Sequence, residues 1–257
     1  MTAPNRTFRE RLLEHSSRIA EVPALVAPAA SITYGELAGE VHALATVLRS
    51  RGVGPGAIVA LTARSEVDHL LAALALLELG APQVALASHD PPAMRLRLAR
   101  RVGATLVLAD RPDDAVAGLD RIDLGAALAS ARANPRGDAE PGFDAAIPAL
   151  YLTGSGTTGE PKVIRFSQHD LARHADNHIN FAGERVLRPA HVEYNNSKRM
   201  RLYTLWQGGT CVFADGTAES LHGQCARHRV TWLELSPLHG ADLLAASRVE
   251  GMLPAYT

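Results

Sequence analysis

Three glycines and four hydroxyl-bearing residues are interleaved in the middle of the chain, and a lysine follows shortly after them. The seven residues are Thr153, Gly154, Ser155, Gly156, Thr157, Thr158 and Gly159, and the lysine is Lys162. Glycine lets backbone N–H groups approach an anion closely. The hydroxyl groups add further donors, and the lysine adds a full positive charge. This combination is typical of a loop that holds the phosphates of a nucleotide.

The flanking residues indicate which kind of phosphate loop this is. The apolar run 147–152 predicts a buried strand before the loop, and residues 162–166 predict a second short strand after the turn at Glu160-Pro161. The glycines also match the G-x-G-x-x-G fingerprint of dinucleotide-binding proteins, but that fingerprint must open a helix. Pro161 and the β-branched residues after it oppose a helix there. A Rossmann-type oxidoreductase is therefore a second alternative only.

Two other phosphate loops do not fit. A Walker A loop requires glycine directly before the lysine and Ser or Thr directly after it, whereas two residues separate Gly159 from Lys162 and Val163 follows. A kinase glycine loop requires later H-R-D and D-F-G motifs, and neither is present. An ordinary turn rich in glycine and threonine stays open as an explanation without function.

The stretch from Ser155 to Lys162, S-G-T-T-G-E-P-K, resembles the phosphate loop of the adenylate-forming superfamily, whose pattern is roughly T-S-G-T-T-G-x-P-K-G-V. That superfamily comprises acyl- and aryl-CoA synthetases, adenylation domains of non-ribosomal peptide synthetases, and luciferases. Gly154 and Val163 depart from the pattern, since the family usually has a hydroxyl residue and a glycine there. Residues 32–37, I-T-Y-G-E-L, and 79–86, L-G-A-P-Q-V-A-L, look like two earlier family motifs.

The resemblance implies the N-terminal part of an enzyme that activates a carboxylic acid with ATP and Mg²⁺. The acyl-adenylate would then be transferred to CoA or to the phosphopantetheine of a carrier protein. Residues 153–159 and Lys162 would bind the nucleotide, with Lys162 and Thr158 as catalytic residues. Family members continue well beyond the position of Thr257 with a C-terminal lid domain. We therefore expect this chain to lack the lid and to be inactive alone, with a carrier protein or the missing part as partner.

Residues 191–201 lie where the family places a motif that lines the acyl pocket. Tyr194, Asn195 and Asn196 are the candidate substrate residues. The usual F-H-x-x-G or F-D signature is absent, so the acid itself is not indicated, and an ordinary polar loop explains the segment equally well. The first alternative to an enzyme is a non-catalytic homologue that binds a nucleotide or a partner protein.

Composition restricts the class of protein. The 257 residues are 47% hydrophobic and 21% charged, with a net charge of −1, so nothing favours nucleic acid as a partner. No apolar stretch is long enough to span a bilayer, and Met1–Arg11 has no apolar signal segment, which predicts a cytoplasmic protein. The two cysteines have no metal spacing, and the neighbouring histidines at 169, 174 and 178 lack a completing carboxylate or cysteine, so no metal site is predicted.

Strand-like and helix-like segments alternate along the chain. Continuous apolar runs at residues 58–61, 84–86 and 105–109 predict buried strands, and amphipathic segments between them predict helices. This order predicts an α/β fold with parallel-type sheets flanked by helices on both faces. We expect two subdomains, residues 1–142 and 143–257, the second incomplete and beginning with the phosphate loop.

Near the expected site, two helices are predicted. Ser167 and Asp170 form a capping-box pattern that starts a helix whose apolar face continues to Ala182. Residues 202–205 begin another helix, which ends at Gly208-Gly209.

Overall fold

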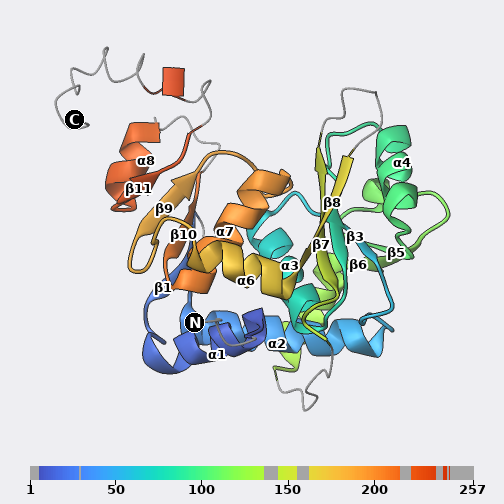
Figure 1. Ribbon diagram of the computed structural model, residues 1–257, viewed down its shortest axis with the longest axis horizontal. Coiled ribbons are helices and arrows are strands. Elements are labelled where there is room, and N and C mark those ends of the chain that lie inside the picture. Colours follow the sequence, from blue (N-terminus) through green and yellow to red (C-terminus); the bar gives the residue numbers. More distant parts are fainter. Residues whose placement is uncertain are drawn as a thin grey trace.

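The computed structural model describes residues 6–28, 30–135, 144–154, 162–214, 221–235, 240–241 and 243. Within these ranges, two β-sheets alternate with layers of helices (Figure 1). The helices are α1 (Phe8–Arg18), α2 (Tyr34–Ser50), α3 (Glu66–Glu78), α4 (Pro92–Val102), α5 (Leu124–Ala133), α6 (Gln168–Asp176), α7 (Asn195–Gln207) and α8 (Leu221–Arg227), with a 3-10 turn η1 (Pro112–Asp114). The strands are β1 (Pro23–Ala27), β2 (Ala30–Thr33), β3 (Val59–Thr62), β4 (Gln83–Ala85), β5 (Leu106–Ala109), β6 (Asp120–Asp123), β7 (Pro148–Gly154), β8 (Lys162–Ser167), β9 (Arg185–Arg188), β10 (Thr210–Phe213) and β11 (Trp232–Leu233).

The first sheet has six strands in the order β6-β5-β3-β4-β7-β8. All neighbouring strands are parallel except β7 and β8, which pair antiparallel. Strands β3 and β4 are buried along their whole length, because helices cover both faces of the sheet and leave no side of these strands for polar residues. The predicted α/β class with covered, mainly parallel strands is confirmed.

The second sheet has five strands in the order β11-β9-β10-β1-β2. Its strands are parallel except for the β1–β2 hairpin near the N-terminus. Each sheet thus takes strands from both sides of residue 142, so the predicted segments 1–142 and 143–257 contribute to both sheets. A division into two subdomains along that line stays a prediction.

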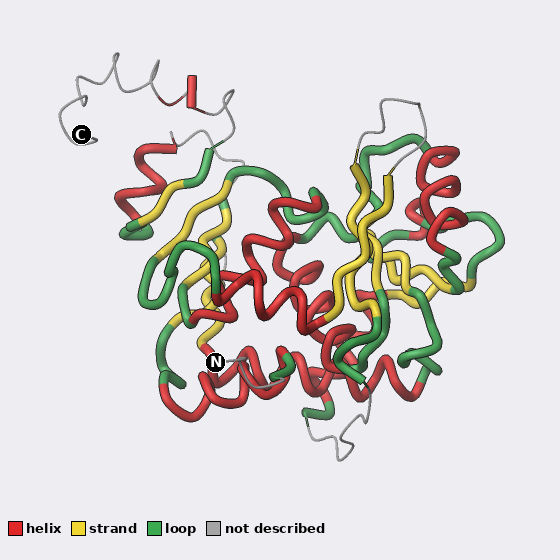
Figure 2. Tube along the Cα trace, viewed as in Figure 1, coloured by secondary structure: helices red, strands yellow, loops and turns green. Residues whose placement is uncertain are grey.

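Helices pack against both sheets, and α1 and α2 run along the bottom of the view (Figures 1 and 2). Helices α3, α6 and α7 lie between the sheets. Helix α4 packs Leu98 and Val102 against the outer face of the six-stranded sheet, in one cluster with Val107 and Tyr151. On the outer face of the five-stranded sheet, Leu221 and Cys225 of the α8 helix pack against the cluster of Val26, Leu187 and Val212. Burial of these apolar faces is the main favourable contribution to the fold.

Local signals in the sequence start several helices. Thr7, Thr33 and Ser167 each close a capping box with an acidic residue three positions later, which satisfies N–H groups at the helix start. The predicted helix from Ser167 to Ala182 is shorter than expected. It ends at Asp176, and Ile179 is 49% exposed beyond it, so the apolar spacing past Asp176 was not a helix face.

Two further differences concern the start of one helix and three elements that the sequence did not predict. Helix α7 begins at Asn195 rather than near residue 202, so the first half of this helix occupies a stretch for which an ordinary polar loop was left open. Strand β6, helix α5 and strand β9 were not predicted. The two strands are short and contain charged residues, and the buried face of α5 consists of two leucines and two small alanines, Leu124, Ala127, Leu128 and Ala131.

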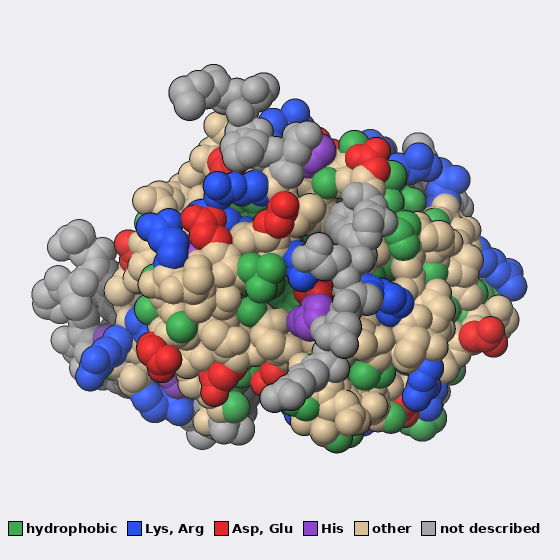
Figure 3. Space-filling view, turned by 90° about the horizontal axis from the view of Figure 1, so that it is seen from below, with side chains coloured by type: hydrophobic (Ala, Val, Ile, Leu, Met, Phe, Trp, Pro, Cys, Tyr) green, Lys and Arg blue, Asp and Glu red, His purple; other side chains and the backbone are tan. Residues whose placement is uncertain are grey.

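Two further features of the described residues are the distribution of surface charge and the length of the apolar helices. On the face in Figure 3, Lys and Arg side chains are mixed with Asp and Glu rather than gathered by sign. No helix among the described residues is both long and apolar enough to cross a bilayer.

The tight junction after α7 generates a stability prediction. A Cβ at Gly209 would lie 2.3 Å from the carbonyl oxygen of Phe181 and 3.0 Å from a methyl carbon of Thr204. Because a backbone oxygen cannot move aside cheaply, we expect Gly209→Ala to lower the free energy of unfolding by about 1–3 kcal/mol in urea titrations. The control is Gly39→Ala inside α2, where no atom lies within 4 Å and alanine should stabilise the helix by up to about 1 kcal/mol. Equal effects of both changes would contradict the packing argument.

Candidate functional site

The predicted phosphate loop connects two antiparallel strands. Thr153 and Gly154 end β7, Lys162 begins β8, and Gly154 and Lys162 are register partners. Lys162 is exposed at the mouth of this hairpin. The predicted loop residues Ser155, Gly156, Thr157, Thr158 and Gly159 lie outside the described residues. Residues 162–167 form a strand and not a helix, as the sequence predicted.

The hairpin mouth lies at the edge of the six-stranded sheet where its parallel strands end. Thr62 is the last residue of β3, Ser88 follows β4 closely, and Gly154 ends β7. The connection after β3 leads to β4 on one side, and the connection after β5 leads to β6 on the other side, so the connections diverge between β3 and β5. In open α/β sheets, ligands bind in the crevice outside the carboxyl ends at such a point.

The segment before helix α7 lies across this edge and brings two of the predicted substrate residues to it. The side-chain amide of Asn195 donates hydrogen bonds to the backbone oxygen and to Oγ1 of Thr153, the latter at 3.1 Å. The hydroxyl of Tyr194, which is 50% exposed, lies 3.2 Å from Nε2 of His89. Asn196 is exposed, and its side-chain oxygen accepts a hydrogen bond from Arg199 at 3.2 Å.

Glu193 is the residue of this segment that the sequence did not single out. Its side chain is 1% exposed. The carboxylate accepts hydrogen bonds from the backbone N–H and the hydroxyl of Ser88, both at 3.0 Å, and from the hydroxyl of Thr62 at 3.5 Å. A carboxylate buried in this way depends on such donors, because losing water without replacement is costly.

A buried lysine accompanies this carboxylate. Lys198, in the first half of α7, is fully buried, and its Nζ has no hydrogen-bond partner among the described residues. Burial lowers the pKa of the Lys198 ammonium to about 7, and the nearby Glu193 carboxylate opposes that shift. Burial, with the charges of Lys198 and His191, also lowers the pKa of His69 well below its usual range.

A second buried charge pair, Arg201 and Glu66, contacts the segment before α7. Arg201 is fully buried in α7 and donates to Oε2 of Glu66 at 3.1 Å and to the backbone oxygen of Arg188 at 2.9 Å. The same oxygen of Glu66 accepts from the backbone N–H of Val192 at 2.7 Å. The guanidinium also lies 4.4 Å from the ring centre of Phe213. These contacts join α3, α7 and the five-stranded sheet.

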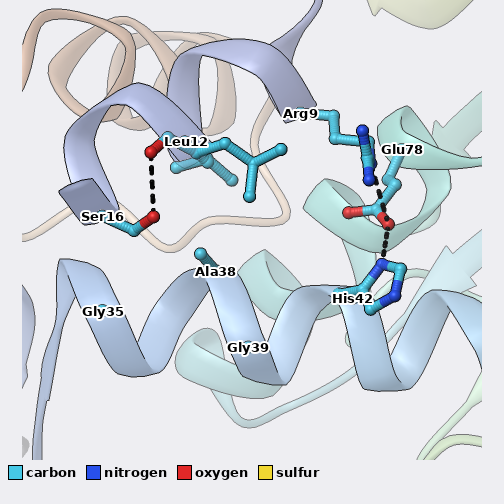
Figure 4. Close-up of a pocket in the computed structure, with 9 residues that line it drawn as sticks. Arg9, Leu12, Ser16, Gly35, Ala38, Gly39, His42 and Glu78 are labelled. Atoms are coloured by element: carbon cyan, nitrogen blue, oxygen red, sulfur yellow. Dashed lines mark hydrogen bonds and ion pairs between the residues drawn. The ribbon is translucent and has the colours of Figure 1, made fainter. Parts of the chain in front are cut away.

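A groove on a different face is separate from this edge. It lies between α1 and α2 and has a volume of about 410 Å³ (Figure 4). Its polar end is formed by Glu78, whose carboxylate lies 2.6 Å from Nδ1 of His42 and 3.6 Å from Nε of Arg9. Glu78 ends α3, whereas Glu66 begins it, so about 18 Å of helix separates the groove from the candidate site.

The model of the AMP-binding enzyme family matches residues 12–256. The chain is 29% identical over 274 residues to an isonitrile lipopeptide synthase of Streptomyces coeruleorubidus, covering 99% of this chain and 18% of that protein. It is 28% identical over 238 residues to the fatty acid–[acyl-carrier-protein] ligase MmaC of Mycobacterium marinum, covering 84% of this chain and 45% of that protein.

A solved structure shares the fold. The N-terminal subdomain of Klebsiella oxytoca NpsA in complex with 3-hydroxybenzoyl-AMSN superposes with a TM-score of 0.79 at 26% sequence identity, covering 90% of this chain and 60% of that one. The chain therefore spans less than two thirds of the length of each of these three relatives.

The buried lysine generates a prediction on the pH dependence of stability. In the unfolded chain a lysine has a pKa of about 10.4, whereas burial lowers that of folded Lys198 to about 7. Between these values the unfolded state binds a proton that the folded state lacks, so this residue makes stability rise with pH. Its contribution is complete above the unfolded pKa and is lost as the pH falls to about 7.

We expect Lys198→Met to remove this rise. Between pH 7.5 and 9.5, the free energy of unfolding of the wild type should increase more steeply than that of the variant, by up to about 1.4 kcal/mol per pH unit. Urea titrations of both proteins at the two pH values measure the difference. Parallel pH profiles would show that Lys198 is charged in the folded protein throughout this range.

Proposed function

The chain belongs to the family of AMP-binding enzymes, and we propose that it forms the N-terminal part of an enzyme that activates a carboxylic acid with ATP. One observation carries this proposal. The mouth of the β7–β8 hairpin, with Lys162, lies at the sheet edge where Asn195 binds Thr153. Nucleotide-binding and acid-binding candidates are thus adjacent.

In the proposed reaction, a carboxylate oxygen of the acid attacks the α-phosphorus of ATP. Pyrophosphate leaves, and an acyl-adenylate forms. The chain's contribution is to hold the triphosphate and to stabilise the charge that develops on it. The N–H and hydroxyl groups of residues 153–159 would serve as donors. Thr158 and Lys162 would be the catalytic residues, the latter as a positive charge at the hairpin mouth.

The metal ion of this reaction is not assigned to protein ligands. Among the residues that the structure describes, no group of three or more His, Cys, Asp or Glu could hold a metal ion. Mg²⁺ would instead enter with the triphosphate, whose charge one lysine cannot balance. No step of the mechanism is routed through it.

The acid would lie next to the start of α7. Asn195 offers an amide and Tyr194 an exposed aromatic ring at the sheet edge, whereas the exposed Asn196 would contribute less directly. The acceptor of the acyl group would be the phosphopantetheine thiol of a carrier protein, because the Mycobacterium marinum relative is named as an acyl-carrier-protein ligase. CoA is the alternative acceptor. The predicted cytoplasmic location stays a prediction.

The phosphate loop is tested in the complete protein by acid-dependent exchange of pyrophosphate into ATP. We expect Lys162→Ala to lower the exchange rate about 100-fold, because it removes the charge at the hairpin mouth. Thr158→Ala should lower it about tenfold. The control is Arg165→Ala, an exposed cation on the same strand, which should leave exchange unchanged.

Two results would count against these assignments. Unchanged exchange in both loop variants would remove the loop assignment. Nucleotide binding by the complete wild-type protein without exchange, over a broad panel of acids, would favour the non-catalytic homologue.

The acid side is tested separately with Asn195→Ala. This change removes both hydrogen bonds to Thr153, so we expect the KM for the acid to rise about tenfold, as loss of roughly 1.4 kcal/mol implies, with the KM for ATP unchanged. Arg132→Ala, which removes an exposed ion pair with Glu40 on a remote surface, is the control. A rise in the KM for ATP alone would place Asn195 on the nucleotide side.

A further inference from the structure

Three consecutive residues of one segment bind three different parts of the sheet edge. Glu193 binds Thr62 and Ser88, Tyr194 contacts His89, and Asn195 binds Thr153. We propose that Glu193 is a positioning residue, which through its buried contacts fixes Asn195 against the last residues of β7. This inference rests on the proposed function, because it takes Asn195 as a residue of the acid site.

The hydrogen bonds of the Glu193 carboxylate hold this side chain in one position. Its carboxylate accepts from both the N–H and the hydroxyl of Ser88 at 3.0 Å, and hydrogen bonds to an ionised acceptor are stronger than those between neutral groups. Thr62 and Ser88 belong to different strand ends. One side chain therefore ties the start of α7 to two strands of the central sheet.

Two basic side chains accompany this buried carboxylate. Nδ1 of His191 lies 3.5 Å from Oε2 of Glu193, and Lys198 adds a positive charge below its lowered pKa of about 7. Its amine is fully buried, has no hydrogen-bond partner among the described residues, and interacts electrostatically with Glu193. Removing one member of a buried charge pair leaves the other uncompensated, whereas removing both is tolerated better. The two side chains should therefore show coupled effects on the same property.

The coupling to the acid site is short. Glu193 lies in a turn closed by the hydrogen bond from the Tyr194 N–H to the backbone oxygen of His191 at 3.1 Å, two residues before Asn195. A shift of Glu193 is therefore expected to displace Asn195 from the backbone oxygen and hydroxyl of Thr153. Helix α7 begins at Asn195, and its N-cap is Tyr194, which makes no side-chain capping hydrogen bond. The hydroxyl of Ser197 donates to the backbone oxygen of Ala190 at 2.6 Å, so the helix start is held by this local contact together with the contacts of Glu193 and Asn195 across the edge.

The test uses the complete protein and acid-dependent pyrophosphate exchange. Glu193→Gln keeps the shape of the side chain and removes its charge. We expect the KM for the acid to rise about tenfold, with the KM for ATP changed less than twofold. At about pH 6, where Lys198 carries its charge, adding Lys198→Met to this variant should recover at least a threefold part of the loss, because the double variant leaves no unpaired lysine.

The matched control is Glu78→Gln at the opposite end of α3 (Figure 4). Glu78 is also a buried carboxylate paired with basic side chains, His42 and Arg9. Its substitution should lower stability without altering the KM for the acid. If both glutamate variants raise that KM equally, the effect is one of general stability and the positioning role of Glu193 is overturned.

A second measurement does not depend on activity. Backbone amide hydrogen exchange in residues 148–154 should accelerate at least fivefold in Glu193→Gln relative to both the wild type and Glu78→Gln. Unchanged exchange there overturns the positioning role, even where the complete wild-type protein activates an acid. Faster exchange in a complete protein that activates none of the acids tested supports the positioning role and counts against the proposed function instead.

Discussion

Helix α7 lies between the two sheets and carries two fully buried basic side chains, Lys198 and Arg201. A buried positive charge needs an opposite charge or a hydrogen-bond acceptor nearby. Arg201 binds Glu66 and three backbone oxygens, while the carboxylate of Glu193 lies 3.5 Å from His191 and acts on the buried Lys198. Burying an unpaired charge costs several kcal/mol, so the helix has few positions that satisfy all of them. These contacts fix where the preceding segment crosses the edge of the six-stranded sheet.

The parts of the fold that the sequence predicted are those where local pattern and burial agree. Strands β3 and β4 are continuous apolar runs because both faces are covered, and Thr33 and Ser167 carry their own capping partners. Helix α7 has almost no amphipathic period, since polar and apolar residues are buried together on it. Its start could not be read from spacing, because the periodic pattern exists only where one face meets water.

In the candidate site, too, some contacts could be predicted from the sequence and others could not. The pairing of Gly154 with Lys162 was predictable, because a strand, a glycine-rich turn and a second strand follow one another in the sequence. The role of Glu193 was not, because Thr62 and Ser88 lie 131 and 105 positions away along the chain. Asn195 was predicted only through the family resemblance, and its contact with Thr153 supplies the physical reason for its position at the edge.

The two sides of the candidate site, the β7–β8 hairpin and the start of α7, differ in how many distant residues build them. The strands that flank the predicted phosphate loop pair with each other, so a short stretch of sequence defines that side of the edge. The side next to α7 is assembled from distant residues, so substitutions at many positions can reshape it while the hairpin is retained. We therefore infer that the identity of the acid must be sought in the residues packed around the start of α7. Under the proposed function, the predicted phosphate loop would serve the step common to all acids and would carry no information about the acid.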